Sequence, residues 1–351
     1  GTGINPFTPF TPKPLQTAAL YLQHAKNYVI GPIVALVRLL LSVVIVVLLF
    51  IFGIVIPKLT FWLWPISRSF ARGAHAILGH LWLFVLGFYR VEVVPYPFHE
   101  LPKNAFAFTP TSPQAQFDGS APLPTNPQQL SPTARDLIIA NHCSYIDVLY
   151  LAAKYAPLFA FPLADDTARV MYATTLSALW HSSFDRDATL EGRRKPQGAI
   201  SLSELLMLGK KLHCPVVLFA EGTPTNGRAL LQFQSQVFDG LSDHQRKTLA
   251  IQMLVFKYEA KHFSPTFPVE PALPHMFKLS CQMYNSLTVN QLRPSEIPAL
   301  PATGKCAKWS TSARQKLGPA GRLLLVALSA QDKAQFLEQW HATQGSYKKL
   351  A

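Results

Sequence analysis

The chain has 351 residues, of which 49% are hydrophobic and 15% are charged, and its formal net charge is +13. An average soluble domain is less apolar and more highly charged, so we expect one large domain joined to a membrane segment, or two small domains. The four cysteines form no closely spaced pair, which excludes a disulfide framework or a zinc module and favours a reducing, cytosol-facing location. The excess of Lys and Arg fits anionic lipid surfaces or phosphorylated molecules rather than nucleic acid, because no nucleic-acid-binding motif accompanies it.

The first 86 residues are predicted to precede the globular domain, with a polar lead at residues 1–27 and apolar segments within residues 28–86. Leu39–Ile56 carries no charge and, as a helix, extends over about 27 Å, close to the thickness of the hydrocarbon core of a bilayer. A second apolar run, Ala74–Phe88, is shorter and suits the membrane interface. We therefore expect a membrane-anchoring helix or a hairpin held in one leaflet; a buried core helix is the alternative.

The globular domain is predicted to span residues 87–285 and to begin with a strand at Gly87–Val93. Residues 95–132 are rich in Pro, Ser, Thr and Gln, which is typical of a flexible insertion that cannot recover the entropy lost on ordering. Residues 286–351 are predicted as a C-terminal helical extension, with helices at Trp309–Leu317 and Arg322–Trp340 joined at Gly318-Pro319.

A histidine and an aspartate follow the apolar run Leu137–Ala140, which is predicted to be a buried strand. Neutral His142 can accept a proton from a hydroxyl near neutral pH, and the Asp147 carboxylate can orient the ring. The segment Ser144-x-x-Asp147 also fits a capping box at the start of a helix, a structural role that does not exclude catalysis. The two side chains can meet if His142 lies in the turn before that helix and Asp147 in its first turn.

Two further polar segments are expected near this pair. Pro215–Phe219 is predicted to be a strand, and it runs into a loop that contains Glu221, Gly222 and Thr223. Arg186, in the polar segment Ser182–Asp187, can bind a phosphate with its guanidinium fork, or form a surface salt bridge with a neighbouring Asp. The three segments are about 35–40 residues apart, the length of one strand–helix unit, so they can meet at one edge of a sheet.

Taken together, these segments resemble the conserved blocks of the glycerolipid acyltransferase family. Asn141-His142-x4-Asp147 is similar to the first block, Phe184-Asp185-Arg186 to the second, and Phe219-Ala220-Glu221-Gly222-Thr223 to the third. The resemblance covers about residues 70–260 and implies an α/β fold with a mixed central sheet flanked by helices. Leu254–Tyr258 is the nearest candidate for a fourth block. The chain departs from the usual pattern at Trp180, Ser183, Ala220 and Pro224.

The resemblance implies a role for each matching residue. His142 would be the general base and Asp147 its partner, while Arg186 would contact the substrate phosphate. Glu221, Gly222 and Thr223 would position the glycerol backbone, and Asn141 belongs to the same substrate-binding set. No metal or other cofactor is expected, because the sequence contains none of the spacings typical of metal ligands.

The implied reaction is the transfer of an acyl chain from acyl-CoA to the free hydroxyl of a lysophospholipid, without an acyl-enzyme. Lysophosphatidic acid, converted to phosphatidic acid, is the first expectation. Lysophosphatidylcholine or lysophosphatidylethanolamine as acceptor is one alternative, and a non-catalytic membrane or lipid-droplet protein with a degenerate domain is another. The expected location is the endoplasmic reticulum membrane, facing the cytosol, or a lipid droplet.

Overall fold

An eight-stranded sheet forms the centre of the molecule in a computed structural model, which describes residues 5–9, 26–96, 136–163, 168–185, 199–260, 263–301 and 306–350. The strand order is β1-β9-β8-β2-β6-β3-β4-β5. The four pairs β1–β9, β8–β2, β2–β6 and β6–β3 are parallel, and the other three are antiparallel. The predicted mixed sheet is therefore confirmed. The strands are β1 (Val91–Tyr96), β2 (Leu137–Ala140), β3 (Leu158–Pro162), β4 (Arg169–Ala173), β5 (Ile200–Ser201), β6 (Val216–Leu218), β8 (Ile251–Glu259) and β9 (Ser286–Leu292).

Helices cover both faces of this sheet. Because successive side chains of a strand point to opposite faces, Leu137 and Ile139 of β2 pack on one side and Ile138 and Ala140 on the other. The first side is covered by α7 (Leu202–Lys211) and α10 (Cys306–Gly321), and the second by α4 (Trp64–Val85), α5 (Tyr145–Tyr155), α6 (Thr175–Phe184) and α9 (Ala272–Ser280). All four β2 residues are fully buried, which explains the uninterrupted apolar run.

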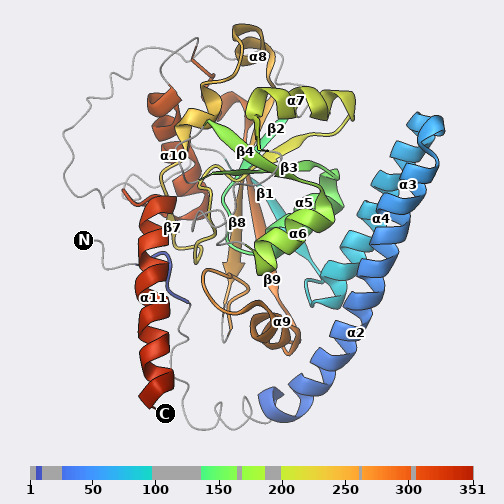
Figure 1. Ribbon diagram of the computed structural model, residues 1–351, viewed down its shortest axis with the longest axis vertical. Helices are drawn as coiled ribbons and strands as arrows, with labels where there is room; N and C mark the ends of the chain where they lie inside the picture. Colours follow the sequence, from blue (N-terminus) through green and yellow to red (C-terminus); the bar gives the residue numbers. More distant parts are fainter. Residues whose placement is uncertain are drawn as a thin grey trace.

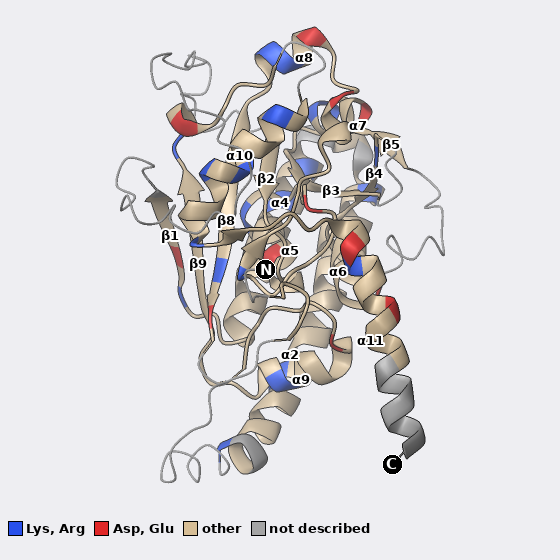
Figure 2. Cartoon of the chain, turned by 90° about the vertical axis from the view of Figure 1, so that its left-hand side faces the viewer, with Lys and Arg blue, Asp and Glu red and all other residues tan. Residues whose placement is uncertain are grey.

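The N-terminal apolar segments form two helices that pack side by side along one flank of the domain (Figure 1). The first comprises α2 (Gly31–Phe50), a π-helical stretch (Ile51–Val55) and α3 (Ile56–Leu59). Together they form a 29-residue helix that is long and apolar enough to cross a membrane. Its outer face exposes Ile33, Leu36, Val37, Leu40, Leu41, Val43, Val44, Val47 and Phe50. Figure 2 shows α2 as almost uncharged, in contrast to α8 (Asp243–Thr248) at the other end of the molecule.

Two features fix this helical pair to the domain. On α4, Gly79 lies so close to α5 that an added Cβ would be 2.7 Å from the Cβ of Ala153. On α2, the buried Arg38 donates hydrogen bonds to the main-chain oxygens of Ser280 and Met283, and to that of Gln282. These carbonyls lie at and just beyond the C-terminal end of α9, where backbone oxygens lack helical partners. The guanidinium therefore replaces the missing donors and holds α2 against α9.

The C-terminal region differs from the prediction at residue 286. Ser286–Leu292 forms β9, which lies inside the sheet between β1 and β8, so the sheet continues past the predicted boundary at residue 285. The predicted break at Gly318-Pro319 is also wrong, because α10 continues to Gly321 with Pro319 inside it. The chain then forms β10 (Leu324–Leu325), which pairs with β7 (Ala229–Leu230), and ends in α11 (Ala330–Leu350). Of the predicted insertion at 95–132, residues 97–132 lie outside the described residues.

The start of the described chain packs beside the loop that follows β6. The buried ring of Phe7 contacts that of Phe336 on α11, with 5.6 Å between centroids, and belongs to a small cluster with Ala229 and Leu231. The side-chain nitrogen of Asn226 donates to the carbonyls of Asn5 and Thr8. Residues 5–9 of the predicted polar lead are thus part of the folded domain.

Candidate active site

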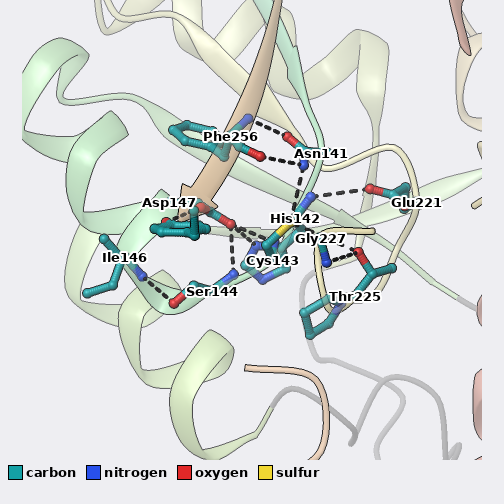
Figure 3. Close-up of polar contacts among 12 residues, drawn as sticks. Asn141, His142, Cys143, Ser144, Ile146, Asp147, Glu221, Thr225, Gly227 and Phe256 are labelled. Carbon is teal, nitrogen blue, oxygen red and sulfur yellow. Dashed lines mark hydrogen bonds and ion pairs between the residues drawn. The ribbon is translucent and has the colours of Figure 1, made fainter. Parts of the chain in front are cut away.

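The predicted pair meets where β2 ends (Figure 3). His142 lies in the turn between β2 and α5, and Asp147 lies in the first turn of α5, as the sequence predicted. The Nδ1 atom of His142 is 3.3 Å from Oδ2 of Asp147. Both residues are almost completely buried, with 2% of His142 and none of Asp147 exposed. A carboxylate at Nδ1 leaves Nε2 as the ring atom that can exchange a proton with a substrate.

The capping box and the carboxylate–imidazole contact are two uses of the same aspartate. Oδ2 of Asp147 accepts hydrogen bonds from the backbone N–H groups of Cys143, at 2.6 Å, and Ser144, at 2.8 Å. The Ser144 side chain in turn accepts from the N–H of Ile146. These bonds satisfy orphan donors at the start of α5 and also hold the carboxylate against His142. The local rule that starts the helix therefore places the second member of the pair.

Aromatic side chains hold the imidazole ring in place. Phe219, the residue after β6, stacks on the ring with 4.3 Å between centroids, and Phe161 of β3 meets it edge-on at 6.2 Å. Nε2 of His142 has no hydrogen-bond partner among the described residues. The ring is therefore oriented by packing on one side and by Asp147 on the other, while its second nitrogen is unused by the fold.

The adjacent thiol does not take part in a comparable arrangement. Cys143 is fully buried, and its Sγ accepts from the side-chain nitrogen of Asn141 at 3.1 Å. Burial, followed by the nearby Asp147 and Glu221 carboxylates, raises the pKa of the Cys143 thiol well above its usual value. A thiol held in its protonated form is a poor nucleophile, so this site lacks the electropositive surroundings of a reactive cysteine.

Asn141 joins the end of β2 to the neighbouring strand. Its side-chain oxygen accepts from the N–H of Phe256 at 2.7 Å, and its side-chain nitrogen donates to the carbonyl of the same residue at 3.1 Å. Asn141 is 1% exposed. The resemblance assigned this residue to the substrate-binding set, whereas its observed contacts are with β8 and Cys143, and they fix the turn that carries His142.

Glu221 connects the His142 turn to the loop after β6. Oε1 accepts from the backbone N–H of His142 at 3.3 Å, and Oε2 accepts from that of Leu231 at 2.8 Å. The side chain is fully buried, which raises the pKa of Glu221 to about 8, although these two donors and the nearby Arg314 favour the ionised form. The carboxyl group that we expected to position glycerol contacts the polypeptide here and supports the backbone of His142.

Gly222 and Thr223 follow in the same loop. Gly222 has a φ of +73°, and an added Cβ would lie 2.4 Å from the side-chain nitrogen of Gln234. The positive φ favours glycine at this position, and an added Cβ would displace the flexible end of the Gln234 side chain. Thr223 is 1% exposed, and its hydroxyl oxygen is buried with no hydrogen-bond partner in the part of the chain that the structure describes. Of the three loop residues predicted to bind substrate, Thr223 is the one with an unused polar atom.

The backbone amides of this loop are mostly occupied. The N–H groups of Gly222, Thr225 and Asn226 donate to the carbonyls of Phe219, His142 and Pro6, at 2.9, 2.9 and 2.8 Å. Those of Cys143 and Ser144 in the His142 turn donate to Asp147. These amides build the site, so they are not free to donate to an oxyanion.

Arg186, which was predicted to contact the substrate phosphate, lies outside the described residues. The described part of the second segment ends at Asp185, after α6. Trp180, one of the departures from the family pattern, is 63% exposed on α6 and its ring lies 4.7 Å from that of Phe184. Within the described ranges, no group of three or more His, Cys, Asp or Glu side chains is arranged to hold a metal ion.

Two contacts at the site were not predicted from the sequence. The Tyr258 hydroxyl donates to Oδ1 of Asp147 at 2.5 Å, and the fully buried Lys333 of α11 donates to the carbonyls of Pro224 and Pro268, each at 2.9 Å. Tyr258 lies in the segment noted as the nearest candidate for a fourth block. The neighbouring residues do not predict that Lys333 is buried, because an Ala-Gln-Asp-Lys stretch is typical of an exposed helix face.

Comparison with known proteins agrees with this description. Residues 124–251 match the family model described as Acyltransferase. A Schizosaccharomyces pombe protein, provisionally named lysophosphatidic acid:oleoyl-CoA acyltransferase, is 29% identical over 205 residues, which cover 58% of this chain and 62% of that protein. The Arabidopsis thaliana lysophospholipid acyltransferase LPEAT1 is 24% identical over 268 residues, which cover 76% of this chain and 62% of the relative. No solved structure matches significantly.

The chain thus has a mixed α/β domain with a buried histidine–aspartate pair at the ends of parallel strands. The segment that carries this pair matches the Acyltransferase family model, in agreement with the resemblance of the first and third blocks. The matched segment spans less than two thirds of the length of either relative.

Proposed function

We propose that this protein transfers an acyl chain from acyl-CoA to the free hydroxyl of a lysophospholipid, with His142 as the general base. The observation that carries the proposal is the geometry of His142. Its Nδ1 faces the buried carboxylate of Asp147, and its Nε2 has no partner among the described residues. An imidazole held in this way is suited to accept a proton from an alcohol.

The proposed reaction proceeds without an acyl-enzyme. As the acceptor oxygen attacks the thioester carbonyl, its proton passes to Nε2 of His142, and Asp147 stabilises the imidazolium that forms. Collapse of the tetrahedral intermediate breaks the carbon–sulfur bond, and the imidazolium returns the proton to the CoA thiolate. General-base assistance of this kind contributes about 10²–10⁴-fold to a rate. The protonated state of buried Cys143 supports direct transfer over an acyl-cysteine route.

Lysophosphatidic acid is our first choice of acceptor and oleoyl-CoA our first choice of donor. The name of the Schizosaccharomyces pombe relative supports both, and we assign the acceptor phosphate to Arg186. A different lysophospholipid, such as lysophosphatidylethanolamine, is the second candidate. It is favoured by the Arabidopsis thaliana relative, whose alignment covers the larger share of this chain. We assign Thr223, with its unused hydroxyl, to the glycerol backbone of the acceptor.

We further propose that α2 to α4 anchor the domain to a membrane as a hairpin held in one leaflet, at the endoplasmic reticulum or on a lipid droplet, facing the cytosol. The apolar outer face of α2 supports this proposal. The chain leaves the domain at α2, which Arg38 fixes to α9, and returns to it along α4, which packs on α5. A hairpin keeps the domain on one side of the bilayer, next to its lipid substrates.

Because His142 is 2% exposed, the proposal requires the acceptor hydroxyl to reach Nε2 within a nearly closed site. Closing a site around the reacting groups excludes water and strengthens the electrostatic interaction between imidazolium and carboxylate. Shielding also limits hydrolysis of the thioester, which competes with transfer to an alcohol. The buried pair therefore fits a site that opens towards lipid rather than towards bulk water.

The test uses the full chain, purified in detergent and reconstituted into phosphatidylcholine vesicles. Oleoyl-CoA is offered with lysophosphatidic acid, lysophosphatidylcholine or lysophosphatidylethanolamine, and product formation is followed by mass spectrometry. We expect transfer to lysophosphatidic acid that is lost in His142→Ala and kept in His244→Ala, whose exposed ring lies on α8. Transfer to another acceptor alone selects the second candidate.

Two results overturn the proposal. Absence of transfer to every acceptor supports a non-catalytic membrane protein. Transfer that persists in His142→Ala, or an acyl adduct on the protein after incubation with oleoyl-CoA alone, refutes His142 as the base of a direct transfer.

A further inference from the structure

The carboxylate of Asp147 is held at both of its oxygens, by different parts of the fold. Oδ2 lies 3.3 Å from Nδ1 of His142 and accepts hydrogen bonds from the N–H groups of Cys143 and Ser144. All three residues belong to the β2–α5 turn. Oδ1 accepts a hydrogen bond from the hydroxyl of Tyr258 on β8, a strand more than 100 residues further along the chain. The terminal torsion of an aspartate is broad, so donors at one oxygen alone leave the carboxylate plane free to rotate.

The position of Tyr258 is itself fixed by the sheet. Two residues earlier on β8, both backbone groups of Phe256 bond to the side chain of Asn141 at the end of β2. The Tyr258 ring packs edge-on against Phe88, with 6.3 Å between centroids and 72° between the ring planes. The phenol therefore meets Asp147 from a rigid strand rather than from a mobile loop.

The direction of the hydrogen bond follows from the surroundings of the phenol. Besides the Asp147 carboxylate, the Cys143 thiol and the Tyr145 hydroxyl lie near it. Burial, followed by the charge of Asp147, raises the pKa of Tyr258 well above its usual value. Tyr258 is therefore the donor in this hydrogen bond, and Oδ1 of Asp147 is the acceptor.

We propose that Tyr258 is a positioning residue for acyl transfer, which acts through Asp147 by fixing the carboxylate plane that orients the His142 imidazole. The inference rests on the proposed function and adds to it a residue outside the three matched segments. Loss of the hydroxyl leaves Oδ1 of Asp147 without its donor, so the carboxylate can turn away from Nδ1. Proton transfer at Nε2 then slows, whereas substrate binding does not depend on this bond.

Tyr258→Phe removes the hydroxyl alone, and Tyr145→Phe is its matched control. Tyr145 is buried and Tyr258 is partly buried; the Tyr145 hydroxyl lies 3.2 Å from Nδ1 of His275 and makes no hydrogen bond to Asp147 within the described chain. Each variant loses one tyrosine hydrogen bond and keeps the aromatic ring, so a general loss of stability affects both. Thermal unfolding of both variants shows whether this match holds.

Two measurements are made on each variant of the full chain in detergent. The first is kcat and KM for oleoyl-CoA and for the most active lysophospholipid. The second is the NMR resonance of the His142 Nδ1 proton in [15N]histidine-labelled protein, assigned by its loss in His142→Ala. The resonance reports the contact with Asp147 and needs no turnover.

We expect Tyr258→Phe to lower kcat about 10-fold, less than removal of the base itself, with KM values unchanged within about 2-fold. We also expect it to shift the Nδ1 proton resonance, and Tyr145→Phe to do neither. An unshifted resonance in Tyr258→Phe, or equal kcat in the two variants, overturns the inference. If the wild type transfers acyl chains to no acceptor while the resonance still shifts only in Tyr258→Phe, the positioning stands and the proposed function fails.

Discussion

Glu221 makes the stability of this fold depend on pH in a direction that can be derived. Its carboxyl group is fully buried between the backbone N–H groups of His142 and Leu231. Burial raises the pKa of Glu221 from 4.5 to about 8. Glu221→Gln replaces the titrating group by a neutral one of nearly the same shape. Its amide nitrogen cannot accept from either N–H group, so the variant loses one hydrogen bond at every pH but also loses the pH dependence.

The sign follows from proton binding in the two states. Between pH 4.5 and about 8 the unfolded chain has released the Glu221 proton, whereas the folded chain still holds it. Folding then requires proton uptake. The contribution of protonated Glu221 to the free energy of unfolding is therefore complete below pH 4.5 and is lost as the pH rises to about 8. At 1.36 kcal/mol per pH unit, an interval of about 3.5 units corresponds to at most about 5 kcal/mol. That is a large part of the 5–15 kcal/mol by which domains are typically stable.

The assay is urea unfolding of the detergent-solubilised chain at pH 5, 6, 7 and 8, followed by tryptophan fluorescence. We expect the wild type to lose stability relative to Glu221→Gln as the pH rises, by an amount on the order of a few kcal/mol. Glu204→Gln is the control. Hydrogen bonds from Ser201 lower the pKa of the exposed Glu204, so it titrates below this range and its curve runs parallel to that of the wild type. A Glu221→Gln curve that is also parallel refutes the reasoning.

Three further predictions concern the surroundings of the site. Gly222→Ala places an alanine at a φ of +73° and should destabilise the fold by about 1–3 kcal/mol, as should Gly227→Ala, where φ is +71°. Chemical denaturation measures both, and stabilities equal to that of the wild type contradict this prediction. Lys333→Met leaves the carbonyl of Pro224 without its buried charged donor and should lower stability by about 2–3 kcal/mol, and a thermal midpoint equal to that of the wild type contradicts this. Arg38→Met removes the donors to the carbonyls at the end of α9, so limited proteolysis should cleave the α9 region faster than in the wild type, and equal rates contradict the anchoring role.

Local patterns predicted the elements that carry the site. The run Leu137–Ala140 is a buried strand because it is apolar at every position, and Ser144-x-x-Asp147 starts α5 because a short side chain can cap the first helical N–H groups. These two rules were sufficient to bring His142 and Asp147 together. Where the rules are weaker, the prediction failed: Pro319 lies inside α10 instead of ending it, since tertiary packing of Leu317 and Ala320 overrides the local preference.

Long-range pairing was beyond the reach of such patterns. Ser286–Leu292 was assigned to a helical extension, yet it forms β9 and completes the sheet between β1 and β8. Glu221 was expected to bind substrate, yet both of its oxygens bond to the backbone. A carboxylate in a loop has the same local sequence whether it faces a ligand or a buried N–H group, and only the fold determines which of them is near.

The sequence by itself determined that a histidine and an aspartate follow a buried strand, and that an apolar helix of membrane length precedes the sheet domain. Both are properties of neighbouring residues, and neighbours in sequence interact through fixed backbone geometry. Only the tertiary structure decided that Tyr258 holds the far oxygen of Asp147, that Glu221 supports the backbone of His142 and that Arg38 joins α2 to α9. These contacts join segments far apart in the chain, so they depend on the order of the strands and on the packing of side chains between them.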